Sequence, residues 1–444
     1  MPNLNRRLFI AAPCLLTLTA FSGGASAAAF QLQEQSASLL GSAFAGRSAD
    51  AHDISHMYFN PATLGVHLGH DPEAEVVLSY ISPTFDFEAE EVPDFSQAHP
   101  SQGEMPGQQS AGGGEDAFVP VFYAATDIIP GLRFGLGINV PYGMETDYPE
   151  DWVGRYDAVN TDLMTIDINP ALGWRVNEQL ALGFGLSAQY ADANLSSMLP
   201  EGGPSDPNLD GKLTVEGDSW AYGFNLGAHF TPTDGTQLGI AYRHGMGHTL
   251  EGDADYQASG AQFTDDSTDG EADLDIPASV NLGIAQQLHQ RWTLLADATW
   301  TQWSDFEELA IEMDDPGITP LGENPEETYD WDDTWMFSLG TRYDHSDQWD
   351  FRFGVAYDQT PTSDRYRTPR IPDEDRTWVA LGGTWQPEAV NNLTVDFAYT
   401  YIWLDDAAIT LAEGLADDGV LDDPVAGEYE SNVQVVAASA NWRF

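Results

Sequence analysis

The sequence predicts an all-β protein, a 14-stranded antiparallel transmembrane β-barrel with an N-terminal segment folded into its lumen as a plug. Three observations lead to this prediction. Segments of about ten residues alternate apolar with small or polar side chains, which is the two-residue period of a strand. The connections between these segments are alternately short and long. Past the N-terminus, no stretch approaches the roughly 20 consecutive apolar residues that a membrane-spanning helix requires.

Residues 1–27 have the features of a secretory signal peptide. Two arginines precede an apolar run from Leu8 to Phe21, and Ala25-Ser26-Ala27 supplies a small-residue cleavage site. We therefore expect a mature chain that starts near Ala28. The single cysteine, Cys14, lies within this signal, so the mature chain should contain no thiol, disulfide or lipid anchor.

The charge balance excludes some function classes. The chain has 71 acidic and 16 basic residues and a formal net charge of -55. This balance argues against nucleic acid as a partner, because phosphate contacts need clustered Lys and Arg. Such an acidic excess is typical of a solvated surface in a salty medium, with cation-binding loops as the alternative. No nucleophile elbow, zinc-protease motif or phosphate-binding loop occurs, so we expect neither an enzyme nor a cofactor.

Residues 28–70 precede the first alternating segment and do not themselves alternate. The stretch from Gln31 to Ser38 is mainly polar, and the stretch from Gly41 to Gly46 supplies small residues that pack closely. A barrel of this size leaks unless its lumen is filled. We therefore interpret residues 28–70 as a hatch within the lumen and residues 71–444 as the barrel.

Each alternating segment has two unlike faces. Between Leu132 and Val140, apolar residues alternate with arginine, glycine and asparagine. The apolar face suits lipid and the small, polar face suits a packed or wet lumen, whereas a soluble barrel would carry many charges on its second face. Bacterial single-chain barrels have an even number of strands. We count 14 segments, centred near Val77, Val121, Leu136, Ile168, Gly185, Phe224, Ile240, Asn281, Ala296, Phe337, Gly354, Leu381, Phe397 and Ala437.

The connections predict which end of the barrel faces the cell interior. Tight turns are expected at 129–131, 177–178, 232–235, 289–290 and 345–347, and long acidic loops at 88–116, 141–160, 191–210, 251–271 and 306–327. Short periplasmic turns and long extracellular loops are typical of outer-membrane barrels. Both termini then lie on the periplasmic side.

Aromatic residues near the strand ends are candidates for the membrane interfaces. We expect interfacial girdles that include Trp300, Trp303, Trp385 and Trp403. The chain ends on an alternating strand that finishes at Phe444. A terminal aromatic strand of this kind predicts recognition by barrel-insertion machinery, and the outward face predicts contact with outer-membrane lipid and lipopolysaccharide.

Eight short motifs are spread along the mature chain. Three lie in the expected hatch: Ala29-Phe30-Gln31-Leu32-Gln33-Glu34-Gln35-Ser36-Ala37, Ala45-Gly46-Arg47 and Tyr58-Phe59-Asn60-Pro61-Ala62. Five lie in the expected barrel: Val140-Pro141-Tyr142-Gly143, Asp151-Trp152-Val153-Gly154-Arg155-Tyr156, Ile168-Asn169-Pro170-Ala171, Pro277-Ala278-Ser279-Val280 and Arg367-Thr368-Pro369-Arg370-Ile371-Pro372-Asp373. Together they resemble the FadL-type transporters of long-chain fatty acids and other hydrophobic compounds in the Gram-negative outer membrane.

This resemblance implies a function and a set of gate residues. It implies capture of the ligand near extracellular loops, passage past a hatch, and lateral exit into the membrane through a kinked strand. Phe30 and the Asn60-Pro61-Ala62 element are the hatch and gate candidates. Fatty acids, alkanes and aromatic hydrocarbons all remain open as ligands, and we expect a monomer. A general diffusion porin for polar solutes is the alternative; a barrel enzyme has no supporting motif, and a receptor role is compatible with transport.

Three arginines are candidates for binding a ligand carboxylate. Guanidinium pairs well with carboxylates, which makes Arg155 a candidate, although an ion pair with Asp151 or Asp157 is the more common arrangement. Arg367 and Arg370 belong to the densest basic cluster of the chain. Because acidic residues are interleaved with this cluster, an internal salt-bridge network is the alternative there.

A metal site in the hatch is not expected from the sequence. His52 and His56 have helical spacing with Asp53 between them, an arrangement that suits a metal on one face of a helix. However, the sequence identifies no third ligand for these two histidines.

Overall fold

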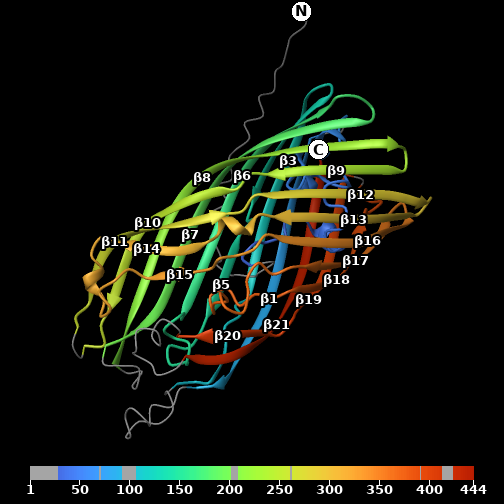
Figure 1. The fold of residues 1–444 in the computed structure, drawn as a ribbon. Coiled ribbons are helices and arrows are strands. Elements are labelled where there is room, and N and C mark those ends of the chain that lie inside the picture. The colour runs from blue at the N-terminus through green and yellow to red at the C-terminus, as the bar shows by residue number, and fades with distance from the viewer. Residues whose placement is uncertain are drawn as a thin grey trace, which may run out of the picture.

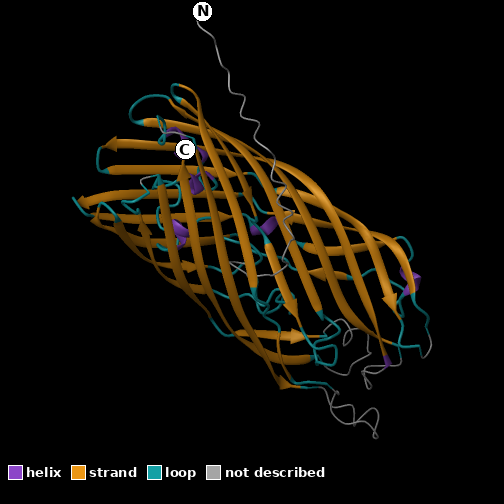
Figure 2. Cartoon of the chain, turned by 180° about the vertical axis from the view of Figure 1, so that it is seen from behind, coloured by secondary structure: helices purple, strands orange, loops and turns teal. Residues whose placement is uncertain are grey.

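The computed structural model describes residues 29–69, 72–92, 107–201, 209–260, 263–390, 392–412 and 424–444. They form a closed antiparallel barrel whose wall strands are tilted relative to the long axis (Figures 1 and 2). No helix among the described residues is long and apolar enough to cross a membrane. The predicted signal peptide, residues 1–27, lies outside the described residues.

Fourteen wall strands follow one another around the barrel, and three of them are divided into two segments. They are β1 (Glu73–Glu91), β3 (Ala117–Ile129), β4 with β5 (Leu132–Asn139 and Gly143–Asp147), β6 (Asn160–Arg175), β7 (Leu180–Pro200), β8 (Asp210–Thr233), β9 with β10 (Thr236–Arg243 and Met246–Gln257), β11 with β12 (Asp266–Ile276 and Ser279–His289), β13 (Trp292–Thr301), β16 (Thr334–Ser346), β17 (Trp349–Asp358), β18 (Arg376–Trp385), β19 (Leu393–Leu404) and β21 (Val425–Arg443). The barrel closes because β1 pairs with both its neighbours: Val77 lies opposite Val121 of β3 and Ser439 of β21. The predicted strand number is confirmed, and each predicted centre lies in a wall strand.

Smaller elements extend the wall strands at the end with the long loops. They are β2 (Ser110–Gly112), β14 (Glu308–Met313), β15 (Glu326–Thr328), β20 (Ala407–Leu411) and the short 3-10 helices η4 (Trp303–Asp305) and η5 (Pro316–Ile318). The opposite end carries the tight turns and the end of β21 (Figure 1).

The two faces of the wall strands differ as expected. Along β4, Arg133 and Asn139 are buried in the lumen, whereas the apolar residues between them alternate to the outside. Leu339 and Leu381 leave about half of their surface uncovered by protein (52% and 55%). An outer face of this composition is stable only in contact with lipid.

Two expectations are corrected. The segment from Glu251 to Glu271 is mainly not a loop, because β10 and β11 are paired along most of it. Their pairing runs from Met246 opposite Ile276 to Tyr256 opposite Asp266. These strands continue into water, where both faces can be polar, so the alternation that marks a strand in lipid is lost. Trp303 is fully buried in the lumen and does not belong to an interfacial girdle, because it packs on other aromatic residues; Trp385 and Trp403 do face outward.

Residues 29–69, which we call the hatch, contain three short helices: α1 (Ala37–Leu40), η1 (Ile54–Met57) and η2 (Pro61–Gly65). Each begins after a capping residue whose side chain accepts a hydrogen bond from a backbone N–H of the helix. The capping residues are Ser36, Asp53 and Asn60, respectively. α1 contacts β18, β19 and β21, and η2 contacts β6, β7 and β8. The hatch is therefore packed against opposite parts of the wall, within the lumen.

Candidate ligand passage and hatch

An apolar cavity, which we call the inner cavity, lies inside the barrel toward the end with the long loops. Half of the residues in its wall are aliphatic, including Leu163, Leu195, Val215, Leu250, Leu274 and Ile311. These residues come from strands β6, β7, β8, β10, β11 and β14, in the parts of these strands that lie toward the long loops. Such a lining suits a hydrophobic ligand.

Phe30 of the hatch connects this cavity to a cluster of aromatic rings. Its ring centroid lies 5.1 Å from that of Trp303, 5.5 Å from that of Phe306 and 5.8 Å from that of Tyr142. Phe30 is 1% exposed and lines the inner cavity. The predicted hatch residue Phe30 is therefore placed where a movement of the hatch would change the shape of the cavity.

Arg370 is the only arginine in the wall of the inner cavity. Its guanidinium donates to the carbonyl oxygens of Asp157 and Asn160 at 2.7 and 3.2 Å, and its Nε lies 3.3 Å from a carboxylate oxygen of Glu327. Backbone carbonyls thus hold the side chain in place, and Glu327 is the acidic partner that the structure gives it. A second hollow, the outer cavity, also has Arg370 in its wall.

The wall is interrupted where β4 ends and β5 begins. The pairing of β3 with β4 stops at Phe122 and Ile138, and β5 pairs with β6 on its other side. At the interruption, the hatch backbone takes the place of a strand. The amide of Leu32 donates to the carbonyl of Pro141 at 2.8 Å, and the amide of Gly143 donates to the carbonyl of Phe30 at 2.9 Å. The N-terminal end of the hatch therefore occupies a gap between β3 and β5.

Gln35 satisfies the polar groups that this interruption leaves in the lumen. Its side-chain amide donates to the carbonyl of Val140 at 2.7 Å, and its side-chain oxygen accepts from Asn139 at 3.2 Å. The hydroxyl of Tyr123 donates to the backbone carbonyl of Gln35 at 2.9 Å. Buried backbone groups need such partners, so the hatch stabilises the interrupted wall and holds its own position by the same contacts.

The Asn60-Pro61-Ala62 element lies against the wall at β6, β7 and β8. The Asn60 side chain accepts from the amide of Ala62 at 3.0 Å and donates to the carbonyls of Ser48 and Ala228 at 2.7 and 3.2 Å. A Cβ on Gly183 would lie 2.2 Å from the backbone of Pro61 and Ala62. The element thus serves as a helix start and as a close contact between hatch and wall; its role as a gate remains a prediction.

Arg155 does not line the inner cavity. It is fully buried, and its Nε lies 2.8 Å from a carboxylate oxygen of Asp210, which is also buried. The guanidinium also donates to the hydroxyl of Tyr156 at 2.6 Å. An internal ion pair is therefore present, as the sequence suggested, and Asp210 is an acidic partner that the sequence did not identify.

Arg367 is part of an internal salt-bridge network. Its guanidinium donates to the carboxylate of Asp364 at 2.8 Å, to that of Glu374 and to the carbonyl of Asp373 at 2.8 Å. Of the three arginine candidates, the structure places Arg370 alone beside the inner cavity, together with Phe30.

Sequence reasoning missed most of the residues that line the cavity. Phe306, Tyr329 and Trp331 pack beside Trp303 in one aromatic cluster, with ring centroids 4.7 to 5.3 Å apart in neighbouring pairs. Phe306 begins the expected loop 306–327, and Trp303, Tyr329 and Trp331 lie just outside it. Four aromatic residues in and around one solvated loop were the available signal, since such loops rarely carry so many.

Comparison with known proteins gives a consistent result. A family model described as "Outer membrane protein transport protein (OMPP1/FadL/TodX)" matches residues 18–444. The chain is 25% identical over 446 residues to the long-chain fatty acid transport protein of Escherichia coli O6:H1, covering 93% of this chain and 95% of that protein. It is similar to the crystal structure of a Pseudomonas aeruginosa FadL homologue, with a TM-score of 0.83, 27% identity, and coverage of 94% of this chain and 100% of the other. The toluene transporter TbuX of Ralstonia pickettii shares the fold, with a TM-score of 0.66, 18% identity, and coverage of 93% and 99%.

Proposed function

The chain belongs to the OMPP1/FadL/TodX family of outer membrane transport proteins, and from this premise we propose that its ligands are long-chain fatty acids. As a member of that family, it is a transporter of hydrophobic compounds in the Gram-negative outer membrane and not an enzyme. The observation that carries the proposal is the inner cavity, whose wall is apolar except for a few polar groups that include Arg370.

The composition of the inner cavity matches the two parts of a fatty acid. Each CH₂ group moved from water to an apolar site contributes about 0.8 kcal/mol, so an acyl chain is stabilised by the aliphatic wall. A carboxylate needs a charged or hydrogen-bonding partner when it leaves water. Arg370 supplies such a partner if the ligand displaces Glu327, whose side chain is 25% exposed and can move into solvent.

The route that we propose begins at the long loops. The outer cavity shares Leu195, Leu309, Ile311 and Arg370 with the inner cavity, so a ligand captured outside can pass along Arg370. Exit would follow the withdrawal of Phe30 and Leu32 from the interruption between β3 and β5. A lateral exit leads directly into lipid, where an acyl chain keeps the free energy gained by leaving water.

Two alternatives differ in the ligand. An uncharged hydrocarbon is favoured by the same apolar wall, and TbuX, which shares the fold, is named a toluene transporter. A general diffusion porin is disfavoured, because the buried hatch occupies the lumen where a porin has an open aqueous channel.

Binding measurements on the purified protein test the ligand class. We expect a long-chain fatty acid to bind, and its methyl ester to bind at least tenfold more weakly at neutral pH. Arg370→Met should remove this preference for the free acid, because the cation is lost while the stem of the side chain is kept. Arg365→Met is the matched control, since Arg365 is exposed in the same basic cluster. Equal binding of acid and ester by the unaltered protein would contradict the fatty-acid assignment and favour uncharged hydrocarbons.

A further inference from the structure

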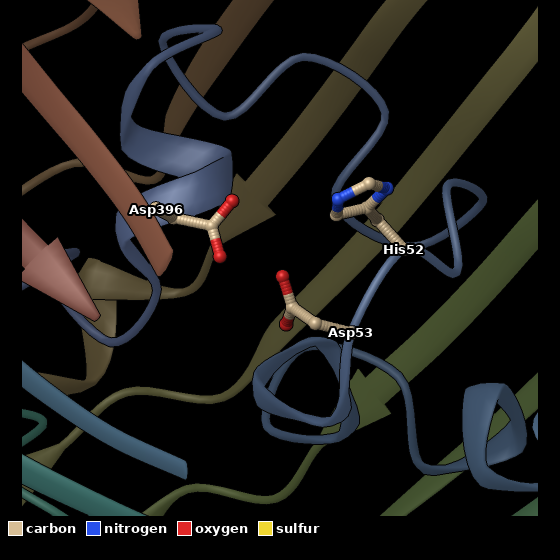
Figure 3. Close-up of side chains that lie close together, drawn as sticks. All are labelled: His52, Asp53 and Asp396. Carbon is tan, nitrogen blue, oxygen red and sulfur yellow. The ribbon is translucent and has the colours of Figure 1, made fainter. Parts of the chain in front are cut away.

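We propose that His52, Asp53 and Asp396 bind a divalent transition-metal ion that fastens the hatch to the barrel wall. One ring nitrogen of His52 and one carboxylate oxygen from each aspartate lie within 4.8 Å of one another. Figure 3 shows the three side chains converging, two from the hatch and one from β19. This inference goes beyond the transport function and does not depend on the identity of the transported ligand.

Hydrogen bonds hold the two carboxylates in place. Asp53 accepts from the hydroxyl of Ser38 at 2.5 Å and from the amide of Ser55 at 3.0 Å. Asp396 accepts from the hydroxyl of Ser439 at 3.2 Å and also from that of Thr384. Both aspartates are at least 95% buried. Side chains fixed in this way lose little conformational freedom when they coordinate an ion, which favours binding.

The surroundings of these side chains carry an excess of buried negative charge. Asp350 lies 4.0 Å from His52, and Arg352 lies 3.2 Å from Asp350 and 3.5 Å from Asp396, so one arginine faces both carboxylates. The buried Oε1 of Glu75, in β1, has no hydrogen-bond partner. Buried carboxylates without enough cations are costly. A divalent ion would supply the missing positive charge.

The ligand set indicates the class of ion. One imidazole nitrogen with two carboxylates suits Zn²⁺ and neighbouring transition metals, whereas Ca²⁺ and Mg²⁺ prefer oxygen ligands alone. In tetrahedral coordination with bond lengths of about 2.1 Å, two ligand atoms of one Zn²⁺ ion lie roughly 3.4 Å apart. The three ligand atoms, which lie within 4.8 Å of one another, would therefore move closer together when the ion binds. The sequence concealed this set because Asp396 lies far from His52 along the chain.

Zinc titration of the untagged, chelator-treated full-length protein in detergent tests the proposal. We expect one Zn²⁺ per chain to compete with a chromophoric chelator, and His52→Gln and Asp396→Asn each to weaken binding at least tenfold. His345→Gln, at an exposed histidine in a tight turn, should bind Zn²⁺ as the unaltered protein does. The proposal is overturned if the unaltered protein takes up no more Zn²⁺ than the double variant His52→Gln, Asp396→Asn.

A second measurement covers the risk that Asp396→Asn fails to fold. Zn²⁺ should raise the thermal unfolding midpoint of the unaltered protein and of His345→Gln, but not that of His52→Gln. His52 is partly exposed, with 17% of its side-chain surface accessible, so its replacement disturbs packing least. An equal rise with Ca²⁺ or Mg²⁺ in place of Zn²⁺ would overturn the assignment of a transition metal.

Discussion

At the scale of single residues, the arginines of this acidic chain differ in what surrounds the guanidinium. Arg155 and Asp210 have no exposed side-chain surface and lie 2.8 Å apart, whereas Arg370 borders two cavities. Removing one member of a buried pair leaves the other charge without compensation, at a cost of roughly 3–5 kcal/mol. The surroundings of the two arginines therefore predict different consequences of substitution.

Substitution of Arg155 should reduce stability and leave ligand binding intact. We expect Arg155→Leu to lower the free energy of unfolding by about 3 kcal/mol or more, because the buried Asp210 then loses the guanidinium that compensates its charge. The double variant Arg155→Leu, Asp210→Leu should recover part of this loss. Denaturant unfolding in detergent measures both, and fatty-acid binding to the folded fraction is the companion measurement. A loss of binding with unchanged stability would instead make Arg155 a ligand-binding residue.

Glu34 of the hatch predicts a dependence of stability on pH. Burial raises the pKa of this carboxyl from its usual 4.5 to about 7. Because the folded protein holds this proton more tightly than the unfolded chain, protonation of Glu34 increases the free energy of unfolding. This contribution is complete below about pH 4.5 and is lost as the pH rises through 7. The difference corresponds to roughly 3 kcal/mol. We expect Glu34→Gln to be more stable than the unaltered protein at pH 8.

Unfolding midpoints between pH 4.5 and 9 measure this effect. Glu178→Gln, at an exposed glutamate in a tight turn, is the control and should follow the unaltered protein across the range. If the unfolding midpoint of Glu34→Gln also changed with pH as that of the unaltered protein does, Glu34 would have the same pKa in the folded and unfolded states. The prediction would then be wrong.

Sequence reasoning at this scale identified residue types but not their partners. The sequence indicated that Arg155 and Arg367 could each form an internal ion pair with an acidic residue. It did not identify Asp210 as the partner of Arg155, because Asp210 lies 55 positions away along the chain. Trp303 was expected at an interface and is buried in the lumen. In both cases the deciding contact joins distant parts of the chain, and one sequence does not show which side chains converge.

At the scale of secondary structure, the interruption between β4 and β5 links the hatch to the wall. Gln31 and Tyr142 form an antiparallel bridge there. Residues paired in this way have Cα atoms about 4.5–5.5 Å apart, within the range that a disulfide spans. Cys14, the natural cysteine, lies in the predicted signal peptide, so an engineered pair should form without competition.

A disulfide at this bridge should block transport without blocking binding. In the oxidised double variant Gln31→Cys, Tyr142→Cys, we expect fatty acid to bind but uptake to fall at least tenfold, and reduction to restore it. The lock keeps the hatch segment in the proposed exit. The matched control is Asp253→Cys, Asp269→Cys, a paired position of β10 and β11 away from the interruption. Unchanged uptake in the oxidised lock would show that this segment need not move.

The strands themselves were largely predictable, because lipid imposes the alternation that marks them. Every predicted centre lies in a wall strand, whereas several strand ends do not match. β10 and β11 extend through a segment expected to be a loop, since strands that leave the membrane no longer need one apolar face. The interruption at Pro141 could not be placed either, because its partner is the hatch and not a neighbouring strand.

At the scale of the whole molecule, the hatch and the barrel are fitted to each other by glycines in the wall. A Cβ on Gly183 would lie 2.2 Å from the backbone at Pro61 and Ala62, and a Cβ on Gly227 would lie 1.9 Å from the side chain of Asn60. Backbone cannot yield as a flexible side chain does, so even one methyl group must displace η2. The fit of η2 to the wall should therefore control how well the lumen is sealed.

Replacement of Gly183 tests whether the hatch is the plug that its sequence predicts. We expect Gly183→Ala to increase ion conductance through single barrels in a planar bilayer severalfold, because the displaced η2 leaves space for water beside β7 and β8. Gly235→Ala is the matched control: its Cβ meets no atom closer than 3.5 Å, and its conductance should equal that of the unaltered protein. Equal conductance in all three proteins would mean that other contacts seal the lumen. In that case the interruption filled by Phe30 and Leu32 would be the remaining place for a gate.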